Sequence, residues 1–186
     1  GPDFNLPIEE LEEAFSKKTK AIVLNSPHNP TGKVFSKEEL ETLSKMIIKN
    51  DAYVISDEVY EFLTFDHHQH IPIASLPGMK ERTITISSAG KTFSFTGWKI
   101  GWCLASENLT KAIRMVHQFN TFGSAHPLQV ALSRAIDEID AYLVSFRESY
   151  QKKRSILYEG LKKSELKPFL PEGTFFILCQ IPSEKN

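Results

Sequence analysis

Short apolar runs alternate with stretches of helical period along this chain. The runs at 21–24, 52–56 and 83–87 are rich in aliphatic and β-branched residues and end in turn-forming sequence, which is typical of buried strands. A further apolar run, 100–105, follows a loop and is also predicted to form a strand. The alternation of strand, loop and helix predicts an α/β fold with a mostly parallel sheet.

The helix-period stretches carry start signals of their own. We predict helices over the ranges 7–15, 36–50, 106–122, 127–139 and 142–164. The second begins with a capping box, in which Ser36 caps the helix and Glu39 follows it in the first turn. Four of its apolar residues are expected to face inward: Leu40, Leu43, Ile47 and Ile48.

Three expectations concern the later part of the chain. Ser106 is the predicted cap of the third helix, and His117 is interpreted as a packed or hydrogen-bonded histidine. The inward positions of that helix are Leu109, Ile113, Val116 and either Phe119 or His117. The basic run 152–154 in the last helix is expected to be a solvated face, and a final strand is predicted over 174–179.

Composition narrows the class of protein. The 186 residues carry 22 Lys and Arg against 23 Asp and Glu, so their near-neutral balance disfavours nucleic acid or an anionic membrane as the main partner. No apolar run approaches the roughly 20 residues of a membrane span. The first residues show no signal-peptide pattern. We therefore expect a cytoplasmic protein, with a mitochondrial location left open.

Two groups of potential metal ligands have simpler interpretations, and no metal is expected. Cys103 and Cys179 both fall in predicted strands and are expected to be buried, reduced thiols, with a disulfide or a metal pair as the alternative. The segment Asp66-His67-His68-Gln69-His70 lacks a defined ligand spacing and has no cysteine near it. A solvated loop is therefore favoured there over a metal site.

Polar residues gather in the loops that follow the three parallel strands. The first loop contains Asn29, the second contains Asp57 and Tyr60, and the third contains Ser88 and Lys91. Ligands of such sheets bind beyond the carboxyl ends of the strands, where neighbouring loops meet. We therefore expect these side chains to converge.

These residue types match the needs of a pyridoxal phosphate site. A lysine in a partly desolvated site can form a Schiff base, and an aspartate at a strand end can keep a pyridinium nitrogen protonated. Tyrosine and asparagine can hydrogen-bond the ring hydroxyl, while Ser88 and Lys99 can hold a phosphate. Each motif alone is also a common turn or helix cap. A nucleotide phosphate loop is excluded, because Thr85 stands where its first glycine would be.

The order and spacing of three motifs resemble those of class I/II aminotransferases, which are fold-type I pyridoxal phosphate enzymes. The motifs are Asn29-Pro30-Thr31-Gly32, Ser56-Asp57-Glu58-Val59-Tyr60, and Ser88-Ala89-Gly90-Lys91 followed by Gly97-Trp98-Lys99-Ile100-Gly101. Together with Leu76-Pro77-Gly78-Met79 and Val116-His117-Gln118, they are most similar to one group of that class. It contains kynurenine aminotransferase (glutamine transaminase K, cysteine-S-conjugate β-lyase) and bacterial methionine aminotransferases.

The resemblance implies catalytic roles for residues in the first two motifs and for the lysine of the third. Lys91 would form the Schiff base with the cofactor and, once released, shuttle the substrate proton. Asp57 would pair with the pyridinium nitrogen. Tyr60 and Asn29 would bond the ring hydroxyl, Tyr60 thereby tuning the acidity of the Schiff base, and Asn29 would also lie beside the substrate.

The resemblance also implies phosphate and substrate contacts. Ser88 and Lys99 would bind the cofactor phosphate. Lys99 stands where many members have arginine, so the charge is kept but the bidentate fork is lost. Phe122 matches an aromatic that lies near the substrate, often in the partner subunit's site, although it equally fits a core residue at a helix end.

For the whole chain the resemblance implies a three-layer αβα sandwich. Residues 1–140 would form part of the cofactor-binding large domain, and residues 141–186 a long linking helix and the start of a small α+β domain. The implied reaction moves an amino group from an aromatic or sulfur-containing amino acid, of the kynurenine, methionine or glutamine type, to a 2-oxo acid. β-Elimination from cysteine conjugates and a non-enzymatic interaction role remain alternatives.

Parts of the family pattern have no counterpart in these residues. The family has an N-terminal glycine-rich phosphate loop, and its arginine for the substrate carboxylate comes late in the small domain. We expect the chain to be a middle portion of a longer, homodimeric parent enzyme. On its own it is expected to have little or no transaminase activity.

Overall fold

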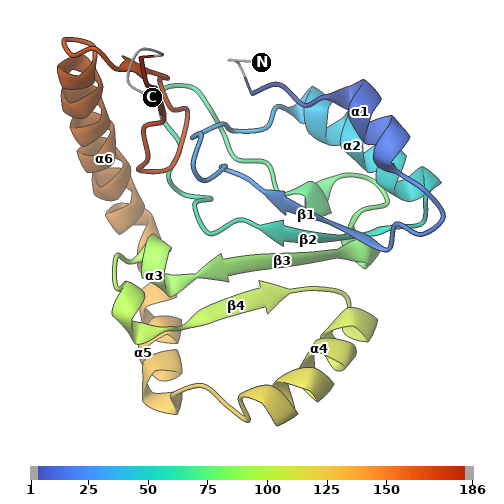
Figure 1. The fold of residues 1–186 in the computed structure, drawn as a ribbon. Helices are drawn as coiled ribbons and strands as arrows, with labels where there is room; N and C mark the ends of the chain where they lie inside the picture. Colours follow the sequence, from blue (N-terminus) through green and yellow to red (C-terminus); the bar gives the residue numbers. More distant parts are fainter. Residues whose placement is uncertain (1–3, 183–186) are drawn as a thin grey trace.

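The computed structural model describes residues 4–182 and contains a four-stranded sheet. Its strands are β1 (Ala21–Asn25), β2 (Tyr53–Asp57), β3 (Thr83–Ser88) and β4 (Gly101–Leu104), in that spatial order. The first three run parallel, and β4 runs antiparallel to β3 (Figure 1). The predicted α/β class with a mostly parallel sheet is confirmed.

Helices connect these strands and follow them. They are α1 (Ile8–Ala14), α2 (Lys37–Lys49), α3 (Ala89–Thr92), α4 (Glu107–Asn120), α5 (His126–Ile136) and α6 (Ile139–Leu161), with 3₁₀ turns η1 (Ile73–Ser75), η2 (Lys80–Arg82) and η3 (Thr96–Trp98). All the predicted helices are present, although α5 ends and α6 begins earlier than expected. Because α6 runs through residue 141 without a break, the domain division near that residue stays a prediction.

The predicted strand over 174–179 is wrong. Within that range only Cys179 is in a strand: β6 (Cys179–Gln180) pairs antiparallel with β5 (Lys167–Pro168). Thr174 has a φ of 65°, a left-handed conformation that cannot continue a strand. Its amide donates to the Leu63 carbonyl at 2.9 Å, so the chain turns inward at this point.

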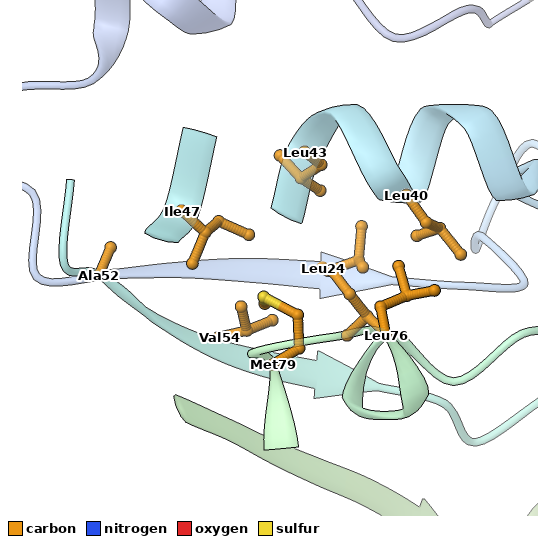
Figure 2. Close-up of a cluster of buried hydrophobic side chains, with 9 residues drawn as sticks. Leu24, Leu40, Leu43, Ile47, Ala52, Val54, Leu76 and Met79 are labelled. Carbon is orange, nitrogen blue, oxygen red and sulfur yellow. The ribbon is translucent and has the colours of Figure 1, made fainter. Parts of the chain in front are cut away.

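The core lies between α2 and one face of the sheet. In Figure 2, Leu40, Leu43 and Ile47 of α2 lie beside Leu24 of β1 and Val54 of β2, and all are buried. Side chains alternate along each strand, so the intervening residues point to the opposite face. There Val23 is 76% exposed and Tyr53 is 47% exposed, so the described residues leave this part of the sheet uncovered.

The start of α2 forms as predicted. The Ser36 hydroxyl accepts from the Glu39 amide at 3.2 Å, and the Glu39 carboxylate accepts from the Ser36 amide at 2.9 Å. This reciprocal pair satisfies two backbone donors at the start of the helix. Ile48, predicted to face inward, is 42% exposed, because it lies one helical step past the fully buried Ile47.

The inward face predicted for α4 is only partly correct. Leu109 and Ile113 are half-buried, but Val116, His117 and Phe119 are exposed. The interpretation of His117 as a core histidine is therefore wrong. The helix is amphipathic, yet the residues 4–182 do not supply a surface that covers this side of it.

Ser106 precedes α4 as predicted but does not cap it with its side chain. Its hydroxyl lies 3.4 Å from the Glu81 carbonyl instead.

The two cysteines are free, but the prediction of buried thiols is wrong for Cys103, which is exposed. Cys103 lies opposite Ile86 in the β3–β4 register, on the sheet face that also carries Tyr53. It is exposed because the described residues leave this face open. Cys179 is half-buried.

The predictions for the histidine-rich segment 66–70 and for the basic run 152–154 are each only partly correct. His67 and His68 are exposed, as expected for a solvated loop, and within residues 4–182 no cluster of His, Cys, Asp and Glu side chains could hold a metal ion. His70, in contrast, is buried against Glu58. In the basic run of α6, the Arg154 side chain is only 8% exposed, so the solvated-face prediction is wrong for it.

No helix among the residues that the structure describes is both long and apolar enough to cross a bilayer.

Candidate active site

The loops after β1, β2 and β3 open at one edge of the sheet. Figure 1 shows these strands pointing toward the side of the molecule where α3 lies. The register aligns Asn25 with Asp57 and Asp57 with Ile86, so β1 and β2 end level with each other and β3 continues past them to Ser88. The predicted site loops therefore start from a common, rigid edge.

The loop after β1 is tied to the end of β2 by Asn25. Its amide nitrogen donates to the Asp57 carbonyl at 3.0 Å, and its amide oxygen accepts from the Asn29 backbone at 2.7 Å. A second bond runs from the Ser26 amide to the same Asp57 carbonyl at 3.1 Å. Asn29 is thereby held next to the end of β2.

The loop after β2 brings Tyr60 and Asn29 together. The Tyr60 ring is buried, and its side chain is hydrogen-bonded to that of Asn29. Burial, followed by the negative charge of Asp57, raises the pKa of the Tyr60 phenol above its usual value of 10.0, against the opposing effect of Asn29. Tyr60 is therefore protonated at neutral pH and can donate a hydrogen bond.

The Asp57 carboxylate lies at the start of this turn. One of its oxygens accepts from the Val59 amide at 3.3 Å. The other makes no hydrogen bond within the described chain.

Lys91 extends from α3 toward the same place. Its Nζ lies 5.6 Å from the centroid of the Tyr60 ring and 5.2 Å from that of Phe175. Within residues 4–182 this amine makes no ion pair. Gly90 allows the tight loop around it, because a Cβ at this position would lie 2.9 Å from the Cα of Thr96. A lysine amine, a phenol and an amide therefore converge beside Asp57.

The two predicted phosphate ligands, Ser88 and Lys99, are not held in a position that is ready to bind a phosphate. The Ser88 hydroxyl accepts from the Gly90 amide at 3.1 Å and lies 3.4 Å from the Ile100 carbonyl. To donate to a phosphate, the Ser88 hydroxyl would have to turn its proton away from the Ile100 carbonyl. Lys99 is exposed and has a φ of 54°, a strained conformation for a residue with a side chain. Both assignments stay predictions.

Phe122 is 89% exposed after the end of α4, so it is not a core residue. Among the described residues no ring contact joins it to Lys91 or Tyr60. Its substrate role also stays a prediction.

Two aromatic residues of the site were missed by the sequence interpretation. Phe175 and Phe176 meet the Tyr60 ring edge to face, with centroids 5.3 and 5.9 Å away. Phe175 also lines an apolar pocket of about 210 Å³ between α6 and residues 171–177. The apolar run after Gly173 is the signal for these two residues, but its pattern predicts a strand.

Glu58 was overlooked because it stands between two more obvious candidates. It is 1% exposed, and its carboxylate accepts from the Ser56 hydroxyl at 2.7 Å and contacts His70 Nε2 at 2.7 Å. The position of Glu61 is similar: its carboxylate accepts from the Ser87 hydroxyl at 2.6 Å. The turn that carries Tyr60 is therefore anchored by two carboxylates, of which Glu58 is buried and Glu61 is half-buried.

Comparison with known proteins identifies the class. The family model for class I and II aminotransferases matches residues 1–186, and the chain belongs to that family. Members of the family generally use pyridoxal phosphate. The subgroup resemblance is confirmed as well: the kynurenine–oxoglutarate transaminase of Dictyostelium discoideum is 49% identical over 174 residues, covering 91% of this chain and 40% of that protein.

Solved structures confirm the fold-type I architecture. N-succinyldiaminopimelate aminotransferase from Mycobacterium tuberculosis superposes with a TM-score of 0.91 at 41% identity, over 94% of this chain and 45% of the other. Escherichia coli YbdL, described with a methionine aminotransferase function, superposes with a TM-score of 0.91 at 35% identity. The match covers 96% of this chain and 47% of YbdL. The chain thus spans less than half the length of the proteins it matches.

Proposed function

We propose that the full-length protein that contains this chain is a pyridoxal-phosphate-dependent aminotransferase. It would transfer an amino group from an aromatic or sulfur-containing amino acid to a 2-oxo acid. The observation that carries the proposal is the meeting of Lys91 Nζ with the Tyr60 ring, while Tyr60 is bonded to Asn29 beside Asp57. We use the term parent enzyme for this full-length protein.

The residues present suit pyridoxal phosphate by their chemistry. An amine, a carboxylate, a protonated phenol and an amide are the groups needed for its aldehyde, its ring nitrogen and its ring oxygen. The free oxygen of Asp57 would face the ring nitrogen, and Tyr60 and Asn29 the ring oxygen. Ser88 and Lys99 would hold the phosphate. When bound, the cofactor supplies a ring that accepts electrons from the substrate.

The chain's own residues would orient the cofactor and move one proton. Asp57, as a carboxylate, would keep the ring nitrogen protonated by charge pairing. The Lys91 amine, set against two aromatic rings with no carboxylate paired to it, would carry the proton that leaves the substrate carbon. Phe175 would shield this amine from water on one side.

The substrate class is inferred from relatives. The similar proteins include kynurenine–oxoglutarate transaminases and an Escherichia coli protein with a methionine aminotransferase function. The apolar pocket lined by Phe175 suits an aromatic or thioether side chain, because its walls are mostly hydrophobic. β-Elimination from a cysteine conjugate begins with the same proton removal but ends in other products.

The first experiment tests the site in the purified parent enzyme. Pyridoxal phosphate is added, and the visible absorption spectrum is compared with that of Lys91→Ala, with Lys152→Ala as the matched control, an exposed lysine on α6. We expect a spectral change that reduction with borohydride makes permanent in the parent enzyme and in Lys152→Ala only. A spectrum independent of Lys91 would overturn the site assignment.

A second experiment tests the reaction. Kynurenine and methionine are supplied with a 2-oxo acid, and the products are identified. A new amino acid derived from the 2-oxo acid supports transamination. Pyruvate and ammonia from a cysteine conjugate, without a new amino acid, would replace transamination by β-elimination.

A further inference from the structure

A largely buried polar cluster lies around the turn that carries Tyr60. Its members are Ser56 and Ser87 on neighbouring strands, Glu58 and Glu61 in the turn after β2, and His70 in the following loop. Three of them, Ser56, Glu58 and Ser87, are no more than 2% exposed, and the His70 side chain is 6% exposed. None of the five has a role in the proposed reaction, so the cluster needs a separate explanation.

Glu61 joins two loops of the candidate site. It directly follows Tyr60, and its carboxylate accepts a 2.6 Å bond from Ser87, which directly precedes Ser88. The backbone of the same turn is anchored at its other end, where the Glu58 amide donates to the Ile86 carbonyl at 2.8 Å. The turn with Tyr60 is thus attached at both ends to the strand that leads into the loop of Lys91.

The surroundings of Glu61 indicate that its hydrogen bond matters more than its charge. Burial raises the pKa of Glu61, and the Glu58 charge adds to this, while the bond from Ser87 and the charge of His70 lower it. A neutral amide could accept the same bond from Ser87 without the penalty of a buried charge. The glutamine variant therefore separates the two contributions.

The remaining members, Ser56 and His70, contact the turn through Glu58. Glu58 contacts Ser56 and His70 with its two oxygens, which leaves His70 Nδ1 buried without a hydrogen-bond partner in the described structure. His70 and Glu58 are the charged groups that act on Glu61, besides its bond to Ser87. The position of Glu61 is therefore fixed by Ser87 of β3 and by its own turn, where the Glu61 amide donates to the Glu58 carbonyl at 2.9 Å.

We propose that Glu61 is a positioning residue, which through Ser87 fixes the distance between the Tyr60 hydroxyl and the Lys91 amine. This inference rests on the proposed cofactor site. A phenol that donates to the ring oxygen stabilises the negative charge there and lowers the proton affinity of the cofactor-bound nitrogen. Loss of the Glu61–Ser87 bond should let Tyr60 move away, and that proton affinity should rise.

The test uses the parent enzyme loaded with pyridoxal phosphate and free of substrate. The pH midpoint of its visible absorption is measured for Glu61→Ala, Ser87→Ala, the double variant and Glu61→Gln. Glu81→Ala, a change at an exposed glutamate, serves as the control. Urea unfolding and the pyridoxal phosphate dissociation constant are measured for every variant.

We expect Glu61→Ala and Ser87→Ala each to raise the midpoint by about 0.5 pH unit, the size of one ordinary hydrogen bond. The double variant should shift no further than either single change, because both remove the same bond. Glu61→Gln should stay within about 0.2 unit of the parent enzyme, since the amide oxygen keeps the bond.

A Glu61→Ala protein that unfolds more easily but keeps the parent midpoint would overturn the inference, because Glu61 would then be purely structural. Additive shifts in the double variant would overturn it as well. If the parent enzyme shows no absorption change that depends on Lys91, the proposed function has failed rather than this role of Glu61.

Discussion

The imidazole Nε2 of His70 lies 2.7 Å from a carboxylate oxygen of Glu58, and the two side chains are 6% and 1% exposed. Their residues are twelve apart in sequence, so the contact joins the strand end at β2 to a loop that looks solvated in sequence. Removing one partner of such a buried pair is costly, because the other polar group then has neither its partner nor water to hydrogen-bond with.

Glu58→Ala should therefore destabilise the parent enzyme by about 3–5 kcal/mol, the range for breaking a buried pair. The substitution leaves His70 and the Ser56 hydroxyl without their partner. Urea unfolding at neutral pH measures the change. Glu81→Ala, at an exposed glutamate, should change the free energy of unfolding by less than about 0.5 kcal/mol. Equal effects of the two substitutions would show that the pair contributes nothing specific.

Gly32 is the glycine whose replacement the structure tolerates least well near the site. It has a φ of 74°, and an added Cβ would meet Pro171 and lie 2.9 Å from the Gly173 carbonyl. Its own carbonyl accepts from the amides of Glu172 and Gly173 at 3.0 and 2.8 Å. Gly32→Ala should lower the free energy of unfolding by about 2 kcal/mol or more, since strain and collision add.

Gly160→Ala provides the matched comparison for Gly32→Ala. Nothing lies within 4 Å of a Cβ built at Gly160, which is inside α6. Alanine is the better helix former, so this substitution should raise stability by up to about 1 kcal/mol. In thermal unfolding, Gly32→Ala should lower the melting temperature and Gly160→Ala should raise it. A change of the same sign in both variants would contradict the close contacts described at Gly32.

Local signals in the sequence were enough to predict the sheet edge and the loops that meet there. The capping box at Ser36 and the apolar strands depend on near neighbours, and they form as expected. Asn29, Tyr60 and Lys91 could be predicted to meet because parallel strands present their following loops at one edge. The motif order then carried the family assignment, which the comparisons confirm.

Contacts between distant segments could not be predicted in this way. Phe175 reaches Tyr60 only because the chain turns at Thr174, and Glu58 is buried only because the loop of His70 folds over it. The exposure of Val116 on α4 has the converse cause: its pattern predicts a covered face, but no residue that the structure describes covers it. The periodicity of apolar residues in a single sequence shows which face of a helix is apolar, but it does not show which surface covers that face.

Asp57→Asn in the parent enzyme should reduce kcat/KM by about 10²–10³, the effect of losing one preorganised charge in an active site. The asparagine oxygen still accepts from the Val59 amide, so the fold is retained. Steady-state kinetics and urea unfolding are measured together. Unchanged kinetics would mean that Asp57 does not pair with the ring nitrogen, and a large loss of stability would mean that its role is structural.

Tyr60→Phe isolates the phenolic hydroxyl while keeping the ring contacts with Phe175 and Phe176. A hydrogen bond to a charged group contributes about 1.5–3 kcal/mol, so cofactor affinity should fall by roughly ten- to a hundredfold. Equilibrium dialysis with pyridoxal phosphate measures it. Tyr53→Phe, on the open face of the sheet, should leave the affinity unchanged, and a similar loss in both variants would contradict the assignment.

The Arg154 guanidinium binds Asp66 through two hydrogen bonds of 2.8 and 3.0 Å and lies 4.7 Å from the Phe65 ring centroid. The bond from Arg154 lowers the pKa of Asp66 below its usual 3.8. A carboxyl whose pKa is lower in the folded state stabilises the fold at pH values above its unfolded pKa. That contribution is lost as the pH falls through the folded pKa.

Asp66→Asn should therefore lower the free energy of unfolding of the parent enzyme at pH 7 by about 0.5–1 kcal/mol, a small value because Asp66 is partly solvated. The difference between parent and variant should shrink as the pH falls below about 3.8. Urea unfolding at a series of pH values from 7 to 3 measures it, with Asp140→Asn, an exposed aspartate on α6, as the control. A difference that stays constant down to pH 3 would mean that the amide change acts through packing, and not through the ionised pair with Arg154.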